Sequence, residues 1–455
     1  MAINAAATWE VRTAGNDTNG GAFVTGASGT DYSQSDTKRT GTGTNDSTTD
    51  AVANGTTTIT SATANFQASI IGNVIYLQGG TGAIAAVRRQ VTARTNATTI
   101  TVDAAVTAST GLTMNVGGAL LSPAIAAAFL TSGNRIFVKA GTYNITTTTN
   151  NVAAGTVSAN VLSLWEGYET NRGDRAFTRP VLTASGISTA TLFTLATNDS
   201  QCICIDVDGA SLTAIRGHSS TVRANYLRCK ASNCTNSGFN VTSAGSFIGW
   251  CWAFNSDTAG AGFNGLAGAA LVGCYASDGS VPGFSGIGTF TRCIADSNSG
   301  ASSDGFTAAN NSTRYFNCVA YNNGRDGFRT STTDAQWYFC ITEGNAGFGY
   351  NISAGTGAGC YNYECTAYND TLGNRNGTFG MGVWDFYPGG DTYFVDAPNG
   401  DFTLNDTGEG QNVQGLSDIF ADEFNVNYLD MGAMQHIDNY ASFRGVGKSG
   451  LITRA

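Results

Sequence analysis

Acidic side chains are the residues whose types and spacing could support chemistry in this sequence. Hydrolysis of a glycosidic bond requires two carboxyl groups about 5 to 9.5 Å apart, a separation that adjacent turns of a repeating structure provide. Asp278 and Asp296 fall near equivalent places in consecutive sequence repeats, and Asp304, Asp326 and Glu343 lie in the same region. With so many acidic residues, suitable pairs arise by chance. The sequence therefore contains weak catalytic candidates, Asp278, Asp296 and Glu343, but no diagnostic catalytic set.

Two shorter motifs suggest a cation site and a cell-attachment site. Asp206 and Asp208 in "CIDVDG" alternate onto one face of a strand and could hold a cation, although a polar strand edge is the more frequent outcome. Arg172-Gly173-Asp174 matches an attachment tripeptide, but three residues arise so easily that an ordinary loop is favoured. No Cys/His cluster has zinc spacing. We therefore expect no cofactor and no resident metal.

The acidic residues lie in a region that repeats a short phrase beginning with cysteine. A Cys-x-Ala or Cys-x-Thr triplet recurs at intervals of 19 to 25 residues, and a Gly-Phe pair follows each of the first six cysteines. A period in the low twenties indicates stacked structural units, and the leucine pattern of leucine-rich repeats is absent. The repeated residues are Cys229, Cys251, Cys274, Cys293, Cys318, Cys340 and Cys365.

This repeat predicts a parallel β-helix in which each unit is one coil of about three short strands. Coils stack at the strand spacing, so that like residues lie above like residues. Alternation places each cysteine and the alanine two residues later on one face, where small side chains suit a crowded interior. We expect free thiols rather than disulfides, because no export signal is visible. Four residues after the cysteines, the corner of each coil is predicted at residues that tolerate left-handed backbone and can stack their amides, including Asn233, Asn255, Asn322 and Asn369.

The residue after each repeated cysteine is predicted to point outward. It is apolar or aromatic in five consecutive coils, and an exposed strip of that kind marks an interface. Because Ile and Val suit protein contact, we favour an interface at which three parallel β-helices pack side by side. A platform that binds glycan is the second interpretation. The structural alternative is that the two faces of each strand are reversed, so that the cysteine and alanine side chains point outward. The predicted subunit-interface or glycan-binding residues are Trp252, Phe254, Tyr275, Ile294, Val319, Tyr321 and Ile341.

Composition excludes several classes of protein. Charged residues form 12% of the chain and the formal net charge is −10, with no long basic run, so nucleic-acid binding is not expected. No apolar run approaches a membrane span. The first residues lack the basic and apolar regions of a secretory signal. The chain has 24 Phe, 17 Tyr and 6 Trp, which are sufficient for a large core, and 59 glycines that suit many short strands and turns.

The chain divides by composition into four segments. Residues 1–55 are rich in Gly, Thr and Asn and predict an extended arm that attaches the protein to a particle. Residues 56–117 contain short alternating strands and predict a small β domain. Residues 118–437 predict the β-helix, capped by a short helix that begins at Ser122-Pro123. Residues 438–455 resemble no coil and form a C-terminal tail.

The repeats resemble the right-handed, single-stranded parallel β-helix of the pectate-lyase-like superfamily. The similar segments are the entry strand "NRIFVKAGTYNI", the stacked Cys/Ala/Asn coils, and the closing segments "GDFTLNDTG" and "YLDMGAMQ". The opening "TWEVRTAGNDTNGGAF" resembles the start of β-helix proteins of bacteriophage virions. "RGHSS" around His218 resembles the histidine segment of polygalacturonases, but their paired aspartates are absent. The resemblance implies the fold strongly and the function weakly, because the fold carries many activities.

The resemblance implies a structural virion protein of tailspike or head-fibre type. We expect a homotrimer on the virion surface, made in the host cytoplasm, that attaches to host-surface polysaccharide or decorates the capsid. Its N-terminal region would bind other virion proteins, with no nucleic-acid partner and no membrane insertion. The alternatives are a glycan-degrading tailspike, with hydrolase or lyase activity, and a leaderless bacterial adhesin. Enzymatic activity is the less favoured alternative.

Overall fold

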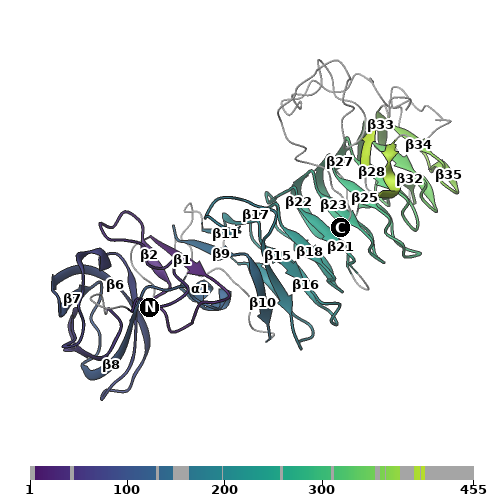
Figure 1. Cartoon of the computed structure of the whole chain (residues 1–455). Coiled ribbons are helices and arrows are strands. Elements are labelled where there is room, and N and C mark those ends of the chain that lie inside the picture. Colours follow the sequence, from purple (N-terminus) through teal and green to yellow (C-terminus); the bar gives the residue numbers. More distant parts are fainter. Residues whose placement is uncertain are drawn as a thin grey trace. The chain divides into compact units, whose positions relative to one another are not determined.

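In the computed structural model, nearly all of the regular secondary structure in the described residues is β-strand (Figure 1). The chain divides into two compact units. Unit 1 comprises residues 1–187, 192–207 and 223–225, and unit 2 comprises residues 188–191, 208–222 and 226–455. Coils of a parallel β-helix occur in both units, which confirms the predicted fold class. The structure describes residues 6–40, 46–129, 133–146, 163–196, 198–256, 260–308, 312–353, 359–363, 365–379, 394–399 and 401–404.

Unit 1 contains a six-stranded antiparallel barrel with the strand order β3-β4-β7-β6-β5-β8. Its interior is filled by alternating apolar side chains such as Ile59, Ile75 and Leu112, all fully buried. The barrel begins at Thr48 rather than at residue 56, because β3 pairs with both β4 and β8. The elements are β3 (Thr48–Ala53), β4 (Thr58–Thr60), η1 (Ala68–Ile70), β5 (Val74–Gly79), β6 (Ile84–Asn96), β7 (Thr99–Val102) and β8 (Ser109–Val116).

The N-terminal segment of unit 1 pairs with the first coil of the β-helix. Strand β1 (Ala7–Val11) is antiparallel to β2 (Ala22–Val24) and parallel to β9 (Arg135–Lys139). The predicted capping helix is α1 (Pro123–Ala128), with a proline in its first turn. Trp9 is fully buried and stacks on Phe129, with ring centroids 5.1 Å apart. These contacts make β1 part of the coil rather than a detached arm.

The first coils follow α1 and β9. Strand β11 (Leu164–Tyr168) is parallel to β9 and to β14 (Ser200–Ile203). On another face, β10 (Gly141–Ile145) is parallel to β12 (Pro180–Ala184). Strands β13 (Thr191–Leu195), β15 (Asp206–Asp208) and β17 (Ala224–Leu227) belong to further coils.

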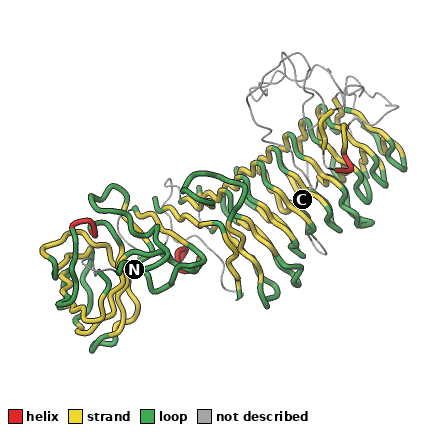
Figure 2. The backbone as a smooth tube through the Cα atoms, in the orientation of Figure 1, coloured by secondary structure: helices red, strands yellow, loops and turns green. Residues whose placement is uncertain are grey.

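Unit 2 contains the cysteine repeats, and its coils are built from short strands joined by tight corners (Figure 2). One face is the parallel sheet β18-β21-β23-β25-β28-β31-β34. The remaining strands form the other faces, and the long strands β22 and β24 extend across two of them. The first face consists of β18 (Lys230–Ser232), β21 (Trp252–Phe254), β23 (Tyr275–Ser277), β25 (Ile294–Asp296), β28 (Val319–Tyr321), β31 (Ile341–Glu343) and β34 (Thr366–Tyr368). The others are β16 (Arg216–Ser220), β19 (Ser237–Val241), β20 (Phe247–Gly249), β22 (Phe263–Val272), β24 (Phe284–Thr291), β26 (Phe306–Ala308), β27 (Thr313–Phe316), β29 (Phe328–Thr330), β30 (Ala335–Tyr338), β32 (Phe348–Ile352), β33 (Tyr361–Tyr363) and β35 (Gly373–Asn376).

The repeated cysteines lie on successive coils, inside the β-helix. Trp252 N donates to Cys229 O and Val319 N donates to Cys293 O, both at 2.9 Å, and the same bond recurs at each step. All eleven cysteines are buried free thiols. Burial lowers their reactivity, because the charged thiolate is poorly solvated in an apolar interior. The predicted corner residues have left-handed backbone, with φ of 52° at Asn233, 50° at Asn255, 49° at Asn322 and 53° at Asn369.

The Gly-Phe pairs form an aromatic ladder at a second corner. Ring centroids of Phe263, Phe284 and Phe306 are 4.7–4.8 Å apart with nearly parallel planes. A side chain at Gly283 would place its Cβ 2.9 Å from Gly305 O, so the close approach of coils requires glycine here. The prediction fails at Gly347-Phe348, because Tyr350 instead pairs with Phe328 and continues the stack.

A second ladder, one residue after the predicted asparagine corner, was not anticipated. Asn298, Asn323 and Asn345 are buried, and each side-chain amide donates to the next coil, at 2.8, 2.9 and 2.7 Å. The last acceptor is the carboxylate of Asp370. The predicted corner shows weaker continuity, with Asn255 Nδ2 donating to Asn233 Oδ1 at 2.8 Å. Buried amides are thus satisfied along the helix axis by their own repeats.

Candidate functional site

The outward strip predicted from the sequence does face away from the β-helix interior, but most of it is covered. We call Tyr275, Ile294, Val319 and Ile341 the covered strip. Tyr275, Val319 and Ile341 have no exposed surface, and Ile294 is 3% exposed. The expectation of an exposed strip is therefore wrong for these four residues, because another segment of the same unit packs on them.

The covering segment is the C-terminal hairpin, residues 394–399 and 401–404. It consists of β36 (Phe394–Asp396), η2 (Ala397–Asn399) and β37 (Asp401–Leu404), and β36 and β37 form a separate antiparallel pair (Figure 1). The predicted closing segment "GDFTLNDTG" contains β37. The rest of that segment, "YLDMGAMQ" and the tail at 438–455 lie outside the described residues.

Beyond the covered strip, the aromatic side chains are partly open to solvent. We call Trp250, Trp252 and Phe254 the aromatic corner. Trp252 and Phe254 are half-buried on β21, and Trp250 is 51% exposed at the left-handed residue that precedes Cys251. The Nζ of Lys230 lies 4.8 Å from the centroid of the Phe254 ring.

Glycine on the following coil creates the space for the Trp250 ring. A Cβ at Gly273 would lie 2.9 Å from Cδ1 and 3.1 Å from Nε1 of Trp250. The indole therefore lies against bare backbone on one side, and half of its surface remains exposed. A large exposed aromatic ring held in this way is a surface suited to a ligand.

The candidate carboxylates are placed differently from one another. Asp278 is exposed at a corner, with φ of 58°, and accepts a hydrogen bond from Ser277 Oγ at 2.8 Å. Asp296 is fully buried and accepts from Tyr275 OH and Ser297 Oγ, both at 2.6 Å. Glu343 is 5% exposed on β31.

The strand register separates the two buried carboxylates of this face. Asp296 pairs with Tyr321, which in turn pairs with Glu343, so these carboxylates lie two coils apart. Asp278 does not share this column. The structure therefore aligns Asp296 with Glu343 but does not bring all three candidates together.

A different pair of carboxylates is stacked on consecutive coils. Asp304 and Asp326 each precede the glycine of a Gly-Phe pair and are 0% and 2% exposed. Arg325 Nε donates to Asp304 Oδ1 at 2.6 Å, and this bond raises the pKa of Arg325. Asn351 Nδ2 donates to Asp326 Oδ2 at 2.6 Å, and Arg329, whose side chain is 32% exposed, lies 3.9 Å from Asp304. The sequence offered both aspartates but could not show that an arginine accompanies them.

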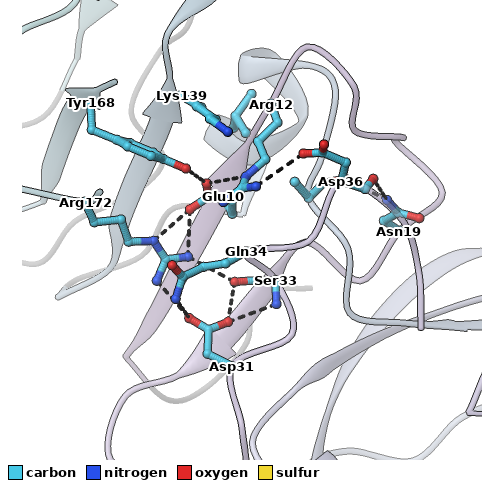
Figure 3. Close-up of polar contacts among 12 residues, drawn as sticks. Glu10, Arg12, Asn19, Asp31, Ser33, Gln34, Asp36, Lys139, Tyr168 and Arg172 are labelled. Atoms are coloured by element: carbon cyan, nitrogen blue, oxygen red, sulfur yellow. Dashed lines mark hydrogen bonds and ion pairs between the residues drawn. The ribbon is translucent and has the colours of Figure 1, made fainter. Parts of the chain in front are cut away.

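Unit 1 contains a buried ionic cluster around Glu10 (Figure 3). Glu10 is fully buried, and its carboxylate accepts from Arg12 Nε at 2.8 Å, from Arg172 Nε at 2.7 Å and from Tyr168 OH. Burial and the neighbouring Glu10 charge raise the pKa of Tyr168. Arg172 NH1 also donates to Asp31 at 2.8 Å. The cluster joins the N-terminal segment to the coil and has the character of a structural ion-pair network.

The Arg172-Gly173-Asp174 motif has one residue in this cluster, Arg172, and one that caps its own loop, Asp174. Asp174 accepts hydrogen bonds from the backbone N–H groups of Thr170 and Asn171, at 2.8 and 3.0 Å. Both charged residues of the tripeptide are thus used within the chain. The ordinary-loop interpretation is supported.

The remaining sequence candidates, Asp206, Asp208 and His218, contact other residues of the fold. Asp206 forms an ion pair with Arg179 at 3.5 Å, and Asp208 accepts from Asn233 Nδ2 at 3.0 Å. Among the described residues, no group of three or more His, Cys, Asp or Glu side chains is arranged to hold a metal ion. His218 is fully buried and stacks on Phe239 with centroids 4.8 Å apart, so it begins the aromatic ladder. No helix in the described part of the chain has the length and apolarity to cross a membrane.

Comparison with known proteins identifies the fold. Neither a protein-family model nor a curated protein matches the chain. Pectate lyase Pel9A is similar over 70% of this chain and 92% of its own, with 16% identity and a TM-score of 0.56. ORF18 of Geobacillus virus E2 matches 51% of this chain and 49% of its own, with 14% identity and a TM-score of 0.40. The A-module of the Azotobacter vinelandii mannuronan C-5 epimerase matches 56% and 89%, with 12% identity and a TM-score of 0.37. The first likeness shows a pectate-lyase-like parallel β-helix.

Proposed function

We propose that unit 2 binds polysaccharide through the aromatic corner. Apolar faces of sugar rings pack against aromatic side chains, while flanking polar groups bond the hydroxyls. Trp250 carries this proposal, because its indole is 51% exposed yet held against the backbone of Gly273. Trp252, Phe254 and Lys230 extend the surface along β18 and β21. The fold supports a glycan ligand through its likeness to a pectate lyase, although fold alone does not define function.

Binding to a panel of neutral and acidic polysaccharides tests this proposal. Affinity electrophoresis of the full chain should show retardation by at least one polysaccharide. Trp250→Ala should weaken that binding about tenfold or more, which corresponds to about 1.4 kcal/mol or more. Leu372→Ala is the matched control, because Leu372 is 62% exposed in the same unit and lies outside the aromatic corner. Equal binding by the wild type and Trp250→Ala would refute the assignment.

In its finer form, we propose that the chain is a structural bacteriophage virion protein of spike or head-fibre type. The resemblance of the opening residues and of the repeats to virion β-helix proteins supports this form. A homotrimer would attach through its N-terminal region to other virion proteins and contact host-surface polysaccharide. Because the hairpin covers the strip on which we expected subunits to meet, the trimer would use another face.

Two measurements test the finer form. A native mass of three chains supports the trimer, and a monomer contradicts it. Peptides of the chain in purified particles support a virion location. Their absence would favour a bacterial surface adhesin.

A second candidate function is cleavage of polysaccharide at the stacked carboxylates. The specific observation is that Asp304 and Asp326 are buried one coil apart beside Arg325 and Arg329. Glycoside hydrolysis uses two carboxyl groups about 5 to 9.5 Å apart, one as general acid and the other as nucleophile or general base. Release of reducing ends should be lost in Asp326→Asn and in Asp304→Asn, with the exposed Asp278→Asn as control. Loss of reducing-end release in Asp278→Asn or Asp296→Asn instead would favour the catalytic candidates suggested by the sequence.

A further inference from the structure

The C-terminal hairpin contacts unit 2 through a small number of aromatic side chains. Phe394, Ala397 and Phe402 are buried in one cluster with the covered strip. Ring centroids of Tyr321 and Phe402 are 5.6 Å apart, and those of Tyr275 and Phe402 are 6.4 Å apart. Phe394 lies edge-on to Phe402 at 5.3 Å. The hairpin therefore places aromatic rings over the tyrosines of the sheet.

The face beneath the hairpin combines the apolar covered strip with a column of polar side chains. Asp296 is fully buried there and bonds to the hydroxyl of Tyr275. Glu343 and Tyr321 follow it in the same outward column. A face that served packing alone would favour apolar side chains, because burial of carboxylates is costly even when they are hydrogen-bonded.

This face is continuous with the aromatic corner. Trp252 on β21 is paired with Tyr275 on β23, and Phe254 is paired with Ser277. Phe254 and Tyr275 also approach each other, with ring centroids 5.6 Å apart. One row of outward aromatic side chains therefore runs from the open corner to residues under the hairpin.

We propose that the C-terminal hairpin is an autoinhibitory cover on a longer glycan-binding face. This inference rests on the proposed function of the aromatic corner and extends the same site to Tyr275, Tyr321 and Asp296. A polysaccharide bound at Trp250 and Trp252 competes with Phe394 and Phe402 for the adjoining surface. The closed state predominates in the free chain, and a long ligand shifts the population toward the open state.

Replacement of both hairpin phenylalanines tests the cover. In the full chain, Phe394→Ala/Phe402→Ala should bind the polysaccharide about tenfold more tightly than the wild type, as expected if about one tenth of wild-type molecules are open. Oligosaccharides short enough to occupy the aromatic corner alone should bind both proteins equally. Leu372→Ala, which removes an exposed side chain outside this surface, should leave both affinities unchanged.

Hydrogen–deuterium exchange of the wild type provides a second readout that does not depend on a variant. Addition of the polysaccharide should increase exchange in residues 394–404 and decrease it in residues 250–254. Two results would overturn the proposal that the hairpin is a cover: unchanged hydrogen exchange in the hairpin, or an affinity of the double variant within about twofold of the wild type. Either result would leave the aromatic corner as the binding site. Absence of polysaccharide binding by the wild type would instead overturn the proposed function itself.

Discussion

Glu10 in unit 1 and Asn323 in unit 2 are both buried, but their polar atoms are satisfied in different ways. Glu10 is surrounded by opposite charges from Arg12, two residues away, and from Arg172, which lies far along the chain. Asn323 bonds to the equivalent amides of the adjacent coils. The ionic cluster depends on particular residues meeting at one place, whereas the ladder depends on repetition. Loss of one member should therefore be more costly in unit 1.

The largest expected effect is that of Glu10→Ala. It removes the shared partner of two largely buried guanidinium groups and should lower the free energy of unfolding of unit 1 by about 3 to 5 kcal/mol. Urea unfolding followed by Trp fluorescence would measure the loss. Asp36→Asn is the control, because this half-exposed partner of Arg12 should contribute no more than about 1 kcal/mol. Equal losses in the two variants would show that Glu10 is not the centre of the cluster.

Asp370 should make the stability of unit 2 depend on pH. Burial raises its pKa from 3.8 to about 6, although Thr342 and Asn345 donate to the carboxylate. The folded state therefore favours the protonated group. Its contribution to the free energy of unfolding is greatest below about pH 4 and declines by up to about 3 kcal/mol as the pH rises to about 6.

Urea midpoints of wild type and Asp370→Asn between pH 4 and 7 would measure this decline. The difference between the two proteins should narrow or reverse as the pH rises, because the variant carries no titrating group at this site. Burial also raises the pKa of Asp46 in unit 1 to about 6. The Asp46→Asn variant therefore measures how much of the pH dependence of stability comes from unit 1. A pH-independent difference for Asp370→Asn would contradict the assignment.

A smaller loss is expected from interruption of the amide ladder. Asn323→Ala leaves the amide of Asn298 without its acceptor and should lower the free energy of unfolding of unit 2 by about 2 kcal/mol. Asn322→Gly, one residue earlier, is the matched control and should change stability by less than about 0.5 kcal/mol, because glycine readily adopts φ near 49°. A loss near zero for Asn323→Ala would show that water or backbone groups, and not the side-chain ladder, satisfy the amide of Asn298.

The smallest effect is expected in the cysteine column. Cys318→Ala removes one buried sulfur from a column in which neighbouring thiols still pack, and should cost about 1 kcal/mol. Thermal unfolding of unit 2 would measure this cost. If Cys318→Ala were as destabilising as Glu10→Ala, the contrast between repeated and unique contacts would be lost.

The repeats made most of the β-helix predictable. Cys-x-Ala, the asparagine corner and Gly-Phe recur because stacked coils place identical residues in identical surroundings, where close approach admits few side chains. The register of β32 was missed because the pattern contains glycine at both 347 and 349, and the choice of Tyr350 over Phe348 depends on packing against Phe328. The buried amide ladder was missed because its positions begin with Cys234, Ser256 and Gly279, and asparagine appears first at Asn298.

The candidate site was less predictable than the fold. Sequence alternation correctly distinguishes the two sides of each strand, but it carries no information about a segment that returns to cover one side. The C-terminal hairpin packs on the outward strip from a later part of the chain. Its three buried apolar residues, Phe394, Ala397 and Phe402, belong to no sequence repeat that would indicate where they pack. Similarly, the proximity of Arg325 to Asp304 depends on the stacking of two corners.

By itself, the sequence determined the coil, its interior columns and the left-handed corners, because these follow from local backbone preference and from periodic burial. Only the tertiary structure decided which outward aromatic residues remain open, which carboxylates are aligned, and how Glu10 is neutralised. These outcomes depend on contacts between segments far apart in the chain, whose free energies arise only when both segments are in place.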